Sequence, residues 1–125
     1  MIPEQIVNET LENSALITDL IDTTAIYLID IPTEYRKVEK APLIRINTIN
    51  DAPQLYASDS NLDETHQVAI NVWTKSIRDI EPFIIALDKT MSDDGWFLYA
   101  RMPVAKDPEI DLYMISRRYT KTFFK

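Results

Sequence analysis

The chain has 125 residues, no cysteine and a formal net charge of −7, with 46% hydrophobic and 26% charged residues. These values indicate a single globular domain, residues 1–125, that is large enough to bury a hydrophobic core. The absence of cysteine excludes disulfides and zinc sites with thiolate ligands. The negative charge argues against a protein whose whole surface binds nucleic acid. No apolar run approaches the ~20 residues that cross a bilayer, so we expect no membrane partner.

The first part of the chain predicts a helix and then two strands. Apolar residues recur at helical spacing from about residue 3 to about 21, and Pro3 suits a first helical turn. TTAIYLIDIP is rich in β-branched and aromatic residues and predicts a strand that Pro32 ends. The charged segment TEYRKVEKAP is a connection, interpreted as an extended hairpin arm. It leads to LIRINTIN, residues 43–50, whose alternation predicts a second strand.

Residues 51–65 show no periodicity and are rich in Asp, Ser and Asn, so they predict a long loop between strands. HQVAINVWTK, which follows, is the clearest strand in the sequence. We expect Val68, Ile70 and Val72 to face the core beneath both helices. Trp73 then lies on the opposite face, at a subunit contact or on the surface of an assembly.

The second helix is predicted after Ser76, where apolar residues return to helical spacing. Ser76 with Asp79 resembles a capping box, and Asp79 is an alternative N-cap that places Pro82 in the first turn. Gly95 in MSDDGW is the only glycine, and we expect it to end this helix with a positive φ. Two strands follow, WFLYARMPV and LYMISRRYTKTFF, with a turn at Asp107-Pro108.

This order predicts an α+β fold, α-β-β-β-α-β-β, with a mixed or antiparallel sheet and two helices packed on one face. One glycine excludes phosphate loops of the GxxxxGK[ST] and GxGxxG types, and one histidine, His66, excludes sites with several histidines. The acidic run from Asp59 to Glu64 mimics the first half of a calcium loop. It lacks glycine at the sixth position and has Ile70 at the twelfth, so an ordinary solvated loop is favoured.

The last 14 residues are basic and aromatic. Two interpretations stay open for this strip: a strand with one core face and one solvated face, or a surface for a neighbouring subunit or for DNA. No acid interrupts the strip, which holds the basic residues Arg117, Arg118, Lys121 and Lys125 and the aromatic residues Tyr113, Tyr119, Phe123 and Phe124.

The whole chain resembles the tail terminator (tail completion) proteins of long-tailed bacteriophages, in the branch from phages of Gram-positive bacteria. The resemblance covers nearly the full length and rests on the order of elements and the acidic loop before the third strand. Four local segments carry it: IPEQIVNETL, VAINVWTKSIRDIEPFIIALDKTM, DDGW and the closing SRRYTKTFF.

The resemblance implies a structural virion protein of the tail and head–tail joint, assembled in the host cytoplasm. Such proteins form a homohexameric ring that caps the tail tube, ends its polymerisation and joins it to the head-completion (connector) protein. DNA passes through the ring without specific binding. The resemblance implies no enzyme activity, no cofactor and no metal.

Three alternatives stay open: another head–tail joining or minor tail protein of similar fold, a small nucleic-acid-binding module that uses the C-terminal strip, and a small hydrolase or metal-dependent enzyme that uses residues 59–66. For the assembly hypothesis, we expect the acidic loop of one subunit to meet the basic strip of the next. The candidate interface residues are Tyr56, Asp59, Asp63, Glu64, Trp73, Arg117, Arg118, Lys121, Phe123 and Phe124.

Overall fold

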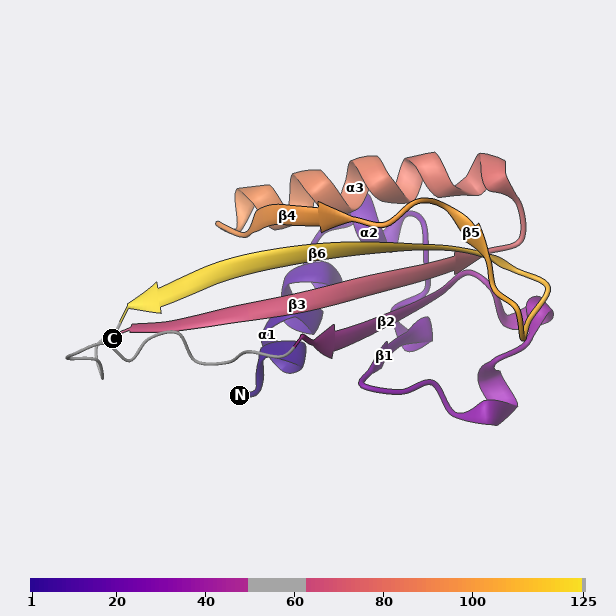
Figure 1. Cartoon of the computed structure of the whole chain (residues 1–125), viewed down its shortest axis with the longest axis horizontal. Helices are drawn as coiled ribbons and strands as arrows, with labels where there is room; N and C mark the ends of the chain where they lie inside the picture. The colour runs from indigo at the N-terminus through magenta and orange to yellow at the C-terminus, as the bar shows by residue number, and fades with distance from the viewer. Residues whose placement is uncertain (50–62, 125) are drawn as a thin grey trace.

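The fold is α+β, a mixed sheet of six strands with the helices packed against it (Figure 1). The computed structural model describes residues 1–49 and 63–124, with only the backbone of Asp63 and Phe124. The helices are α1 (Pro3–Glu12), α2 (Ala15–Thr18) and α3 (Ile80–Asp93), and the strands are β1 (Ile26–Leu28), β2 (Leu43–Thr48), β3 (Asp63–Thr74), β4 (Phe97–Arg101), β5 (Ala105–Lys106) and β6 (Tyr113–Phe124).

The predicted first helix is divided in two. Asn13 ends α1, and Ser14, which has an extended backbone, precedes α2. Asn and Ser are weak helix formers because their side chains compete for hydrogen bonds outside the helix. The Ser14 hydroxyl lies 2.8 Å from that of Thr90 on α3 and shares a hydrogen bond with it. The break therefore lets Val7 and Leu11 of α1 and Ile17 of α2 pack into one core.

The strand order is β1-β2-β3-β6-β4, with β5 paired to the other end of β6. All pairings are antiparallel except that of β1 with β2, so the prediction of an extended hairpin arm between them is wrong. The predicted strand at residues 23–32 shortens to β1 because Ile29 adopts a φ of 72° and turns the chain out of the sheet. The connection forms two short 3-10 turns, Thr33–Tyr35 and Val38–Lys40.

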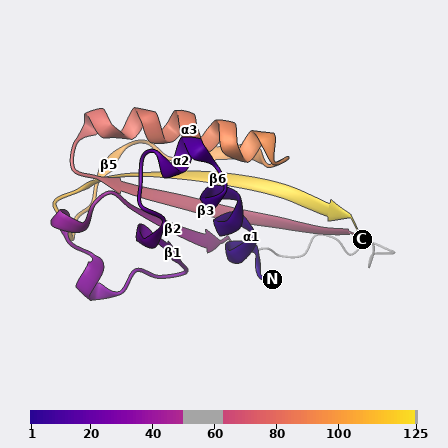
Figure 2. The ribbon, with the colours of Figure 1, turned by 180° about the vertical axis from the view of Figure 1, so that it is seen from behind.

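The helices cover one face of the sheet. α1 and α2 lie behind the strands in Figure 1 and in front of them in Figure 2. Val68, Ile70 and Val72 are fully buried in the core on this side, together with Ile80 and Leu87 of α3, as predicted. Ile84 packs against the same core and is partly buried.

A second, smaller cluster lies on the opposite face, at the end of the sheet near β5. Its buried members are Ile31, Leu43, Trp73 and Leu112. The β1–β2 connection supplies Ile31 and the β5–β6 turn supplies Leu112, so two connections cover this end of the face. The predicted turn is present: the Asp107 carboxylate accepts hydrogen bonds from the backbone N–H groups of Glu109 and Ile110.

β3 and β6 extend beyond their neighbours at the other end of the sheet, as Figure 1 shows. The last β2 partner of β3 is Thr48 opposite Val68, and the first β4 partner of β6 is Phe97 opposite Thr120. Residues 63–66 and 121–124 therefore pair only with each other among the described residues. We call this two-stranded extension the arm.

Gly95 ends α3 with a φ of 88°, as predicted. The Gly95 N–H donates to Ser92 O at 3.0 Å and the Trp96 N–H to Met91 O at 2.9 Å, which is the Schellman pattern of a helix end. Asp79 is the N-cap residue and Pro82 lies in the first turn, also as predicted. The capping box is wrong, because Ser76 makes no capping hydrogen bond with its side chain.

Candidate functional site

Trp73 lies on the face away from the helices, as the alternation predicts, but the chain itself covers it. The side chain belongs to the second cluster, and the residue is 3% exposed. Its indole N–H donates to Asp107 Oδ2 at 2.8 Å, and the Arg45 guanidinium lies 5.2 Å from the ring centre. The expectation that Trp73 is available to a neighbouring subunit is therefore corrected.

Arg117 of the C-terminal strip points toward the helices and is buried against α3. Its Nε donates to Asp88 Oδ1 at 3.2 Å, and a second nitrogen pairs with Asp88 Oδ2. The Tyr119 hydroxyl donates to the same carboxylate at 2.7 Å. Burial, and then this hydrogen bond, raise the pKa of Tyr119, so its hydroxyl keeps its proton. Arg117 is thus a buried residue whose charge is already paired within the chain, which argues against the role at an interface that the sequence suggested.

Lys121 and Phe123 belong to the arm, where they pair with His66 and Glu64. The Phe123 ring makes edge contacts with the rings of His66 and Trp96, at centroid distances of 5.4 and 5.9 Å. Lys121 Nζ lies 4.9 Å from the Phe123 ring centre and donates to the backbone oxygen of Asp94. Phe123 therefore packs against its own chain, and with Lys121 it fixes the arm to the end of α3.

The remaining candidates from the acidic loop are placed only in part. Asp63 pairs with Phe124 in the β3–β6 ladder, so residues 63–65 belong to a strand and not to the predicted loop. Glu64 is exposed, and its carboxylate lies 3.7 Å from His66 Nε2. Tyr56 and Asp59 lie outside the described residues.

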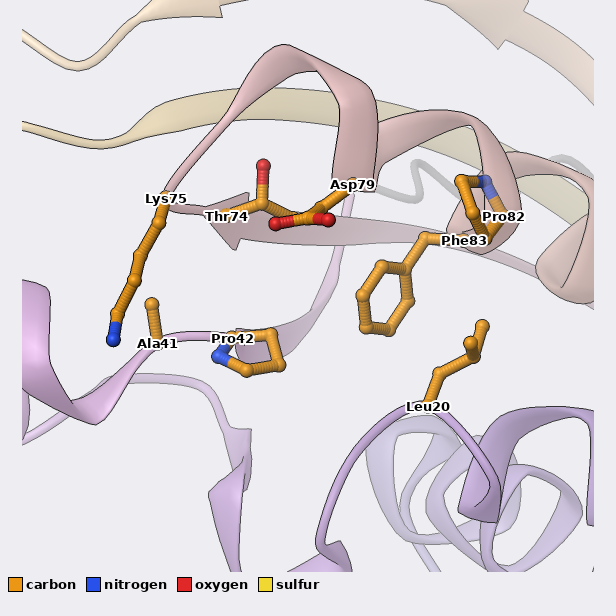
Figure 3. A pocket seen from close by; sticks show the side chains of 8 residues that line it. All are labelled: Leu20, Ala41, Pro42, Thr74, Lys75, Asp79, Pro82 and Phe83. Carbon is orange, nitrogen blue, oxygen red and sulfur yellow. The ribbon is translucent and has the colours of Figure 1, made fainter.

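A hollow with a volume of about 330 Å³ lies between the start of α3 and the β1–β2 connection. Figure 3 shows Phe83 and Leu20 facing Pro42 across it, with Lys75 beside Ala41. Lys75 and Asp79 are its titratable residues, and both are exposed. One carboxylate and one exposed ammonium give neither a nucleophile with a base nor a pair of poised acids.

The outer edge at β4 is apolar and exposed. Phe97, at the start of β4, is 68% exposed, and Ile85 of α3 is 64% exposed. Ile85 lies one helical turn before Lys89, which lines a shallow hollow beside Phe97, so helix and strand contribute to the same side of the molecule. We call this surface the β4 edge. Its exposed apolar residues are Ile85, Phe97, Tyr99, Met102 and Val104.

The opposite outer edge, at β1, is a second apolar surface built from different residues. Ile29 is 55% exposed, and the turn around it is closed by a hydrogen bond of 2.8 Å from Asp30 N–H to Leu28 O. The Tyr35 ring stacks on that of Tyr27 at a centroid distance of 6.0 Å. We call this surface the β1 edge. Its exposed apolar residues are Ile29, Tyr35 and Val38.

A polar hollow of about 420 Å³ lies on the sheet face away from the helices. Arg45 on β2, Asn71 on β3 and Arg118 on β6 line it, because each alternates with residues that face the core. The Nε atoms of both arginines and Asn71 Oδ1 are buried and have no hydrogen-bond partner among the described residues. Of the predicted candidates only Arg118 lies here. The alternation around Arg45 and Asn71 was a signal for the other two.

The described residues contain no group of three or more His, Asp or Glu side chains that could hold a metal ion. None of the helices described is long and apolar enough to cross a membrane. Comparison with protein-family models and with curated proteins finds no match for this chain.

Proposed function

We propose that this protein is a structural subunit that assembles head-to-tail into a ring, and that the ring is the tail terminator of a long-tailed bacteriophage. The observation that carries the ring is the pair of exposed apolar surfaces, the β4 edge and the β1 edge, at opposite ends of one strand order. A head-to-tail contact joins two different surfaces of the same protein and closes when the rotation between neighbours closes.

The geometry favours such a contact for two further reasons. β1 and β4 are the outermost strands in the order, and an outer strand presents backbone N–H and C=O groups that a second chain can pair with. Exposed apolar residues that gather along such an edge are typical of sites of protein association. Phe97 and Ile85 supply this apolar surface at the β4 edge, and Ile29 supplies it at the β1 edge.

The phage role comes from the resemblance of the sequence. In this proposal six subunits form the ring, which caps the finished tail tube, ends its polymerisation and contacts the head-completion protein. DNA passes through the central channel. A protein with a net charge of −7 suits that position, because it repels the phosphates and does not retain the DNA. The protein acts without catalysis, cofactor or metal, in the virion at the head–tail joint.

The proposal is tested by the mass and shape of the purified protein. Light scattering across a range of concentrations gives the number of subunits, and negative-stain imaging shows whether the assembly is a closed ring. We expect a discrete assembly that forms with increasing concentration and has an open centre. A protein that stays monomeric at every concentration, or that forms two-fold symmetric dimers, contradicts the head-to-tail ring.

A further inference from the structure

We propose that the polar hollow formed by Arg45, Asn71 and Arg118 binds a single oxyanionic group, and that in the assembled protein this group is a carboxylate of a neighbouring copy of the chain. The second part rests on the proposed ring, whereas the first does not. Arg45 and Arg118 stand on either side of β3. Arg45 pairs with Asn71 and Arg118 with Ala69, two residues further along β3. With a strand spacing of about 4.8 Å and a rise of about 3.3 Å per residue, the two backbone positions are separated by about 12 Å, a span that two arginine side chains bridge from both sides.

Arg45 and Arg118 do not stabilise each other, and both have hydrogen-bonding capacity left for a ligand. Two guanidinium groups that share a hollow repel each other, and the described residues offer neither one a carboxylate. Their buried Nε groups remain without acceptors. A buried donor without a partner is unfavourable. An oxyanion between the two arginines reduces their charge repulsion and also satisfies their donors, because it accepts charge-assisted hydrogen bonds from both.

The walls of the hollow orient the two arginines and add a third contact. The Trp73 ring beneath Arg45 holds that guanidinium in place. Asn71, which is 9% exposed, has no partner for its Oδ1. A half-turn of this amide presents its NH₂ group to an anion instead. The site therefore selects a compact group such as a carboxylate or a phosphate.

Charge favours a protein carboxylate over a nucleic-acid phosphate. Arg45 and Arg118 are the only charged residues on this face over residues 43–47, 65–73 and 114–122, whereas nucleic-acid surfaces contact several phosphates along a strip. The chain has 20 acidic residues, so a second copy supplies many carboxylates. Ile29, the most exposed apolar residue of the β1 edge, lines the hollow, so a subunit that docks on this edge reaches it.

The first experiment measures anion binding by the protein itself. Thermal unfolding is followed with added sodium phosphate and with sodium chloride at matched ionic strength, for the wild type, Arg118→Gln and Arg45→Gln. Arg78→Gln, which changes an exposed arginine outside the hollow, is the control. We expect phosphate to raise the Tm of the wild type and of the control, and to bind at least about tenfold more weakly to both hollow variants. No phosphate effect beyond that of chloride, or an equal loss in the control, overturns the site.

The second experiment identifies the source of the anion. A labelled peptide of glutamates and a labelled DNA duplex of equal formal charge are titrated with the protein at one salt concentration. Peptide binding that Arg118→Gln abolishes supports the carboxylate. Duplex binding that the same change abolishes overturns it in favour of nucleic acid. If the hollow variants lose phosphate binding but assemble like the wild type, the carboxylate does not come from a second copy. A wild type that binds phosphate but never assembles contradicts the ring and leaves the anion site standing.

Discussion

Gly95 and Ile29 both adopt a positive φ, and the two residues show opposite uses of this conformation. Gly95 takes it without strain and closes α3. Ile29 is β-branched, so the same region is strained for it, and the turn is held by hydrogen bonds of 2.8 Å from Ile29 N–H to Ile46 O and from Asn47 Nδ2 to Ile29 O. The strained residue, Ile29, therefore lies in the β1 edge and also lines the polar hollow.

At position 95 the positive φ, and not a lack of space, makes a side chain unfavourable. A Cβ atom at this position meets Lys121 Cε at 3.4 Å, the flexible end of a long side chain. We therefore expect Gly95→Val to lower the free energy of unfolding by about 1–3 kcal/mol, and Gly95→Asn to lower it less, because Asn tolerates positive φ. Urea denaturation measures both. Equal losses in the two variants show that contact with Lys121, and not φ, is responsible.

Asp107 connects two parts of the second cluster. One carboxylate oxygen organises the β5–β6 turn and the other accepts from the Trp73 indole. Burial acts to raise the pKa of Asp107, but hydrogen bonds from the Glu109 N–H, the Trp73 indole and the Ile110 N–H, with the charge of Arg36, outweigh it and hold the pKa below its ordinary value of 3.8.

Asp107→Asn keeps the acceptor for the turn but turns an NH₂ group toward the indole. We expect Asp107→Asn to lower the free energy of unfolding by about 1–3 kcal/mol at neutral pH. The pKa of Asp107 is lower in the folded state, so its carboxylate stabilises the fold above the ordinary value and loses this effect as the pH falls through the folded pKa. The difference in Tm between wild type and variant should therefore be constant near neutral pH and shrink below about pH 4. A difference that grows on acidification contradicts the sign.

At the scale of elements, the ionic contact between α3 and β6 buries Arg117 and pairs its charge within the chain. Asp88 on α3 binds both Arg117 and Tyr119 on β6, so a helix and a strand of the same chain neutralise the charge. Reversing that charge with Arg117→Glu places two carboxylates together in a buried site and destabilises the monomer. Such a variant therefore reports on folding and not on subunit contacts.

Removal of Asp88 provides the test. Asp88→Ala leaves the Arg117 guanidinium buried without its carboxylate partner. We expect this change to lower the free energy of unfolding by about 3 kcal/mol or more. Tyr119→Phe removes one hydrogen bond and costs about 1 kcal/mol. Asp93→Ala is the control, because its pair with Lys89 is exposed and contributes about 0.5 kcal/mol or less. If Asp88→Ala unfolds at the same urea concentration as the control, the contact is not structural.

Patterns within one element predicted the fold well, and contacts between distant elements account for what they missed. The period-2 alternation placed Val68, Ile70 and Val72 in the core, and Gly95 marked the end of α3. The break at Ser14 depends on Thr90, and the partner of Arg117 lies on another element, so neither follows from local spacing. The alternation did contain a signal for the strip, because Arg117 lies between Ile115 and Tyr119, which face the core, whereas Arg118 does not.

At the scale of the whole molecule, the two apolar edges lie at opposite ends of the strand order. The helices close one face and the second cluster covers one end of the other, so the two edges and the polar hollow are the surfaces that we propose for contact with another copy. The arm adds a third feature. It projects past the sheet body (Figures 1 and 2), and the contacts of Phe123 and Lys121 hold it in a defined direction.

Phe97 tests the β4 edge directly. It is 68% exposed, so Phe97→Glu should leave the Tm of the monomer nearly unchanged. In a ring the same side chain is buried against a neighbour. The change should raise the protein concentration at half assembly by at least about tenfold, because it removes a large apolar contact and adds an unpaired charge.

Ile77→Glu is the matched control, because Ile77 is also apolar and exposed but belongs to neither edge. Light scattering of the three proteins over one concentration series gives the result. We expect the control to assemble like the wild type while Phe97→Glu remains monomeric over most of the series. Assembly of Phe97→Glu at the wild-type concentration places the contact elsewhere on the molecule and removes the β4 edge from the ring.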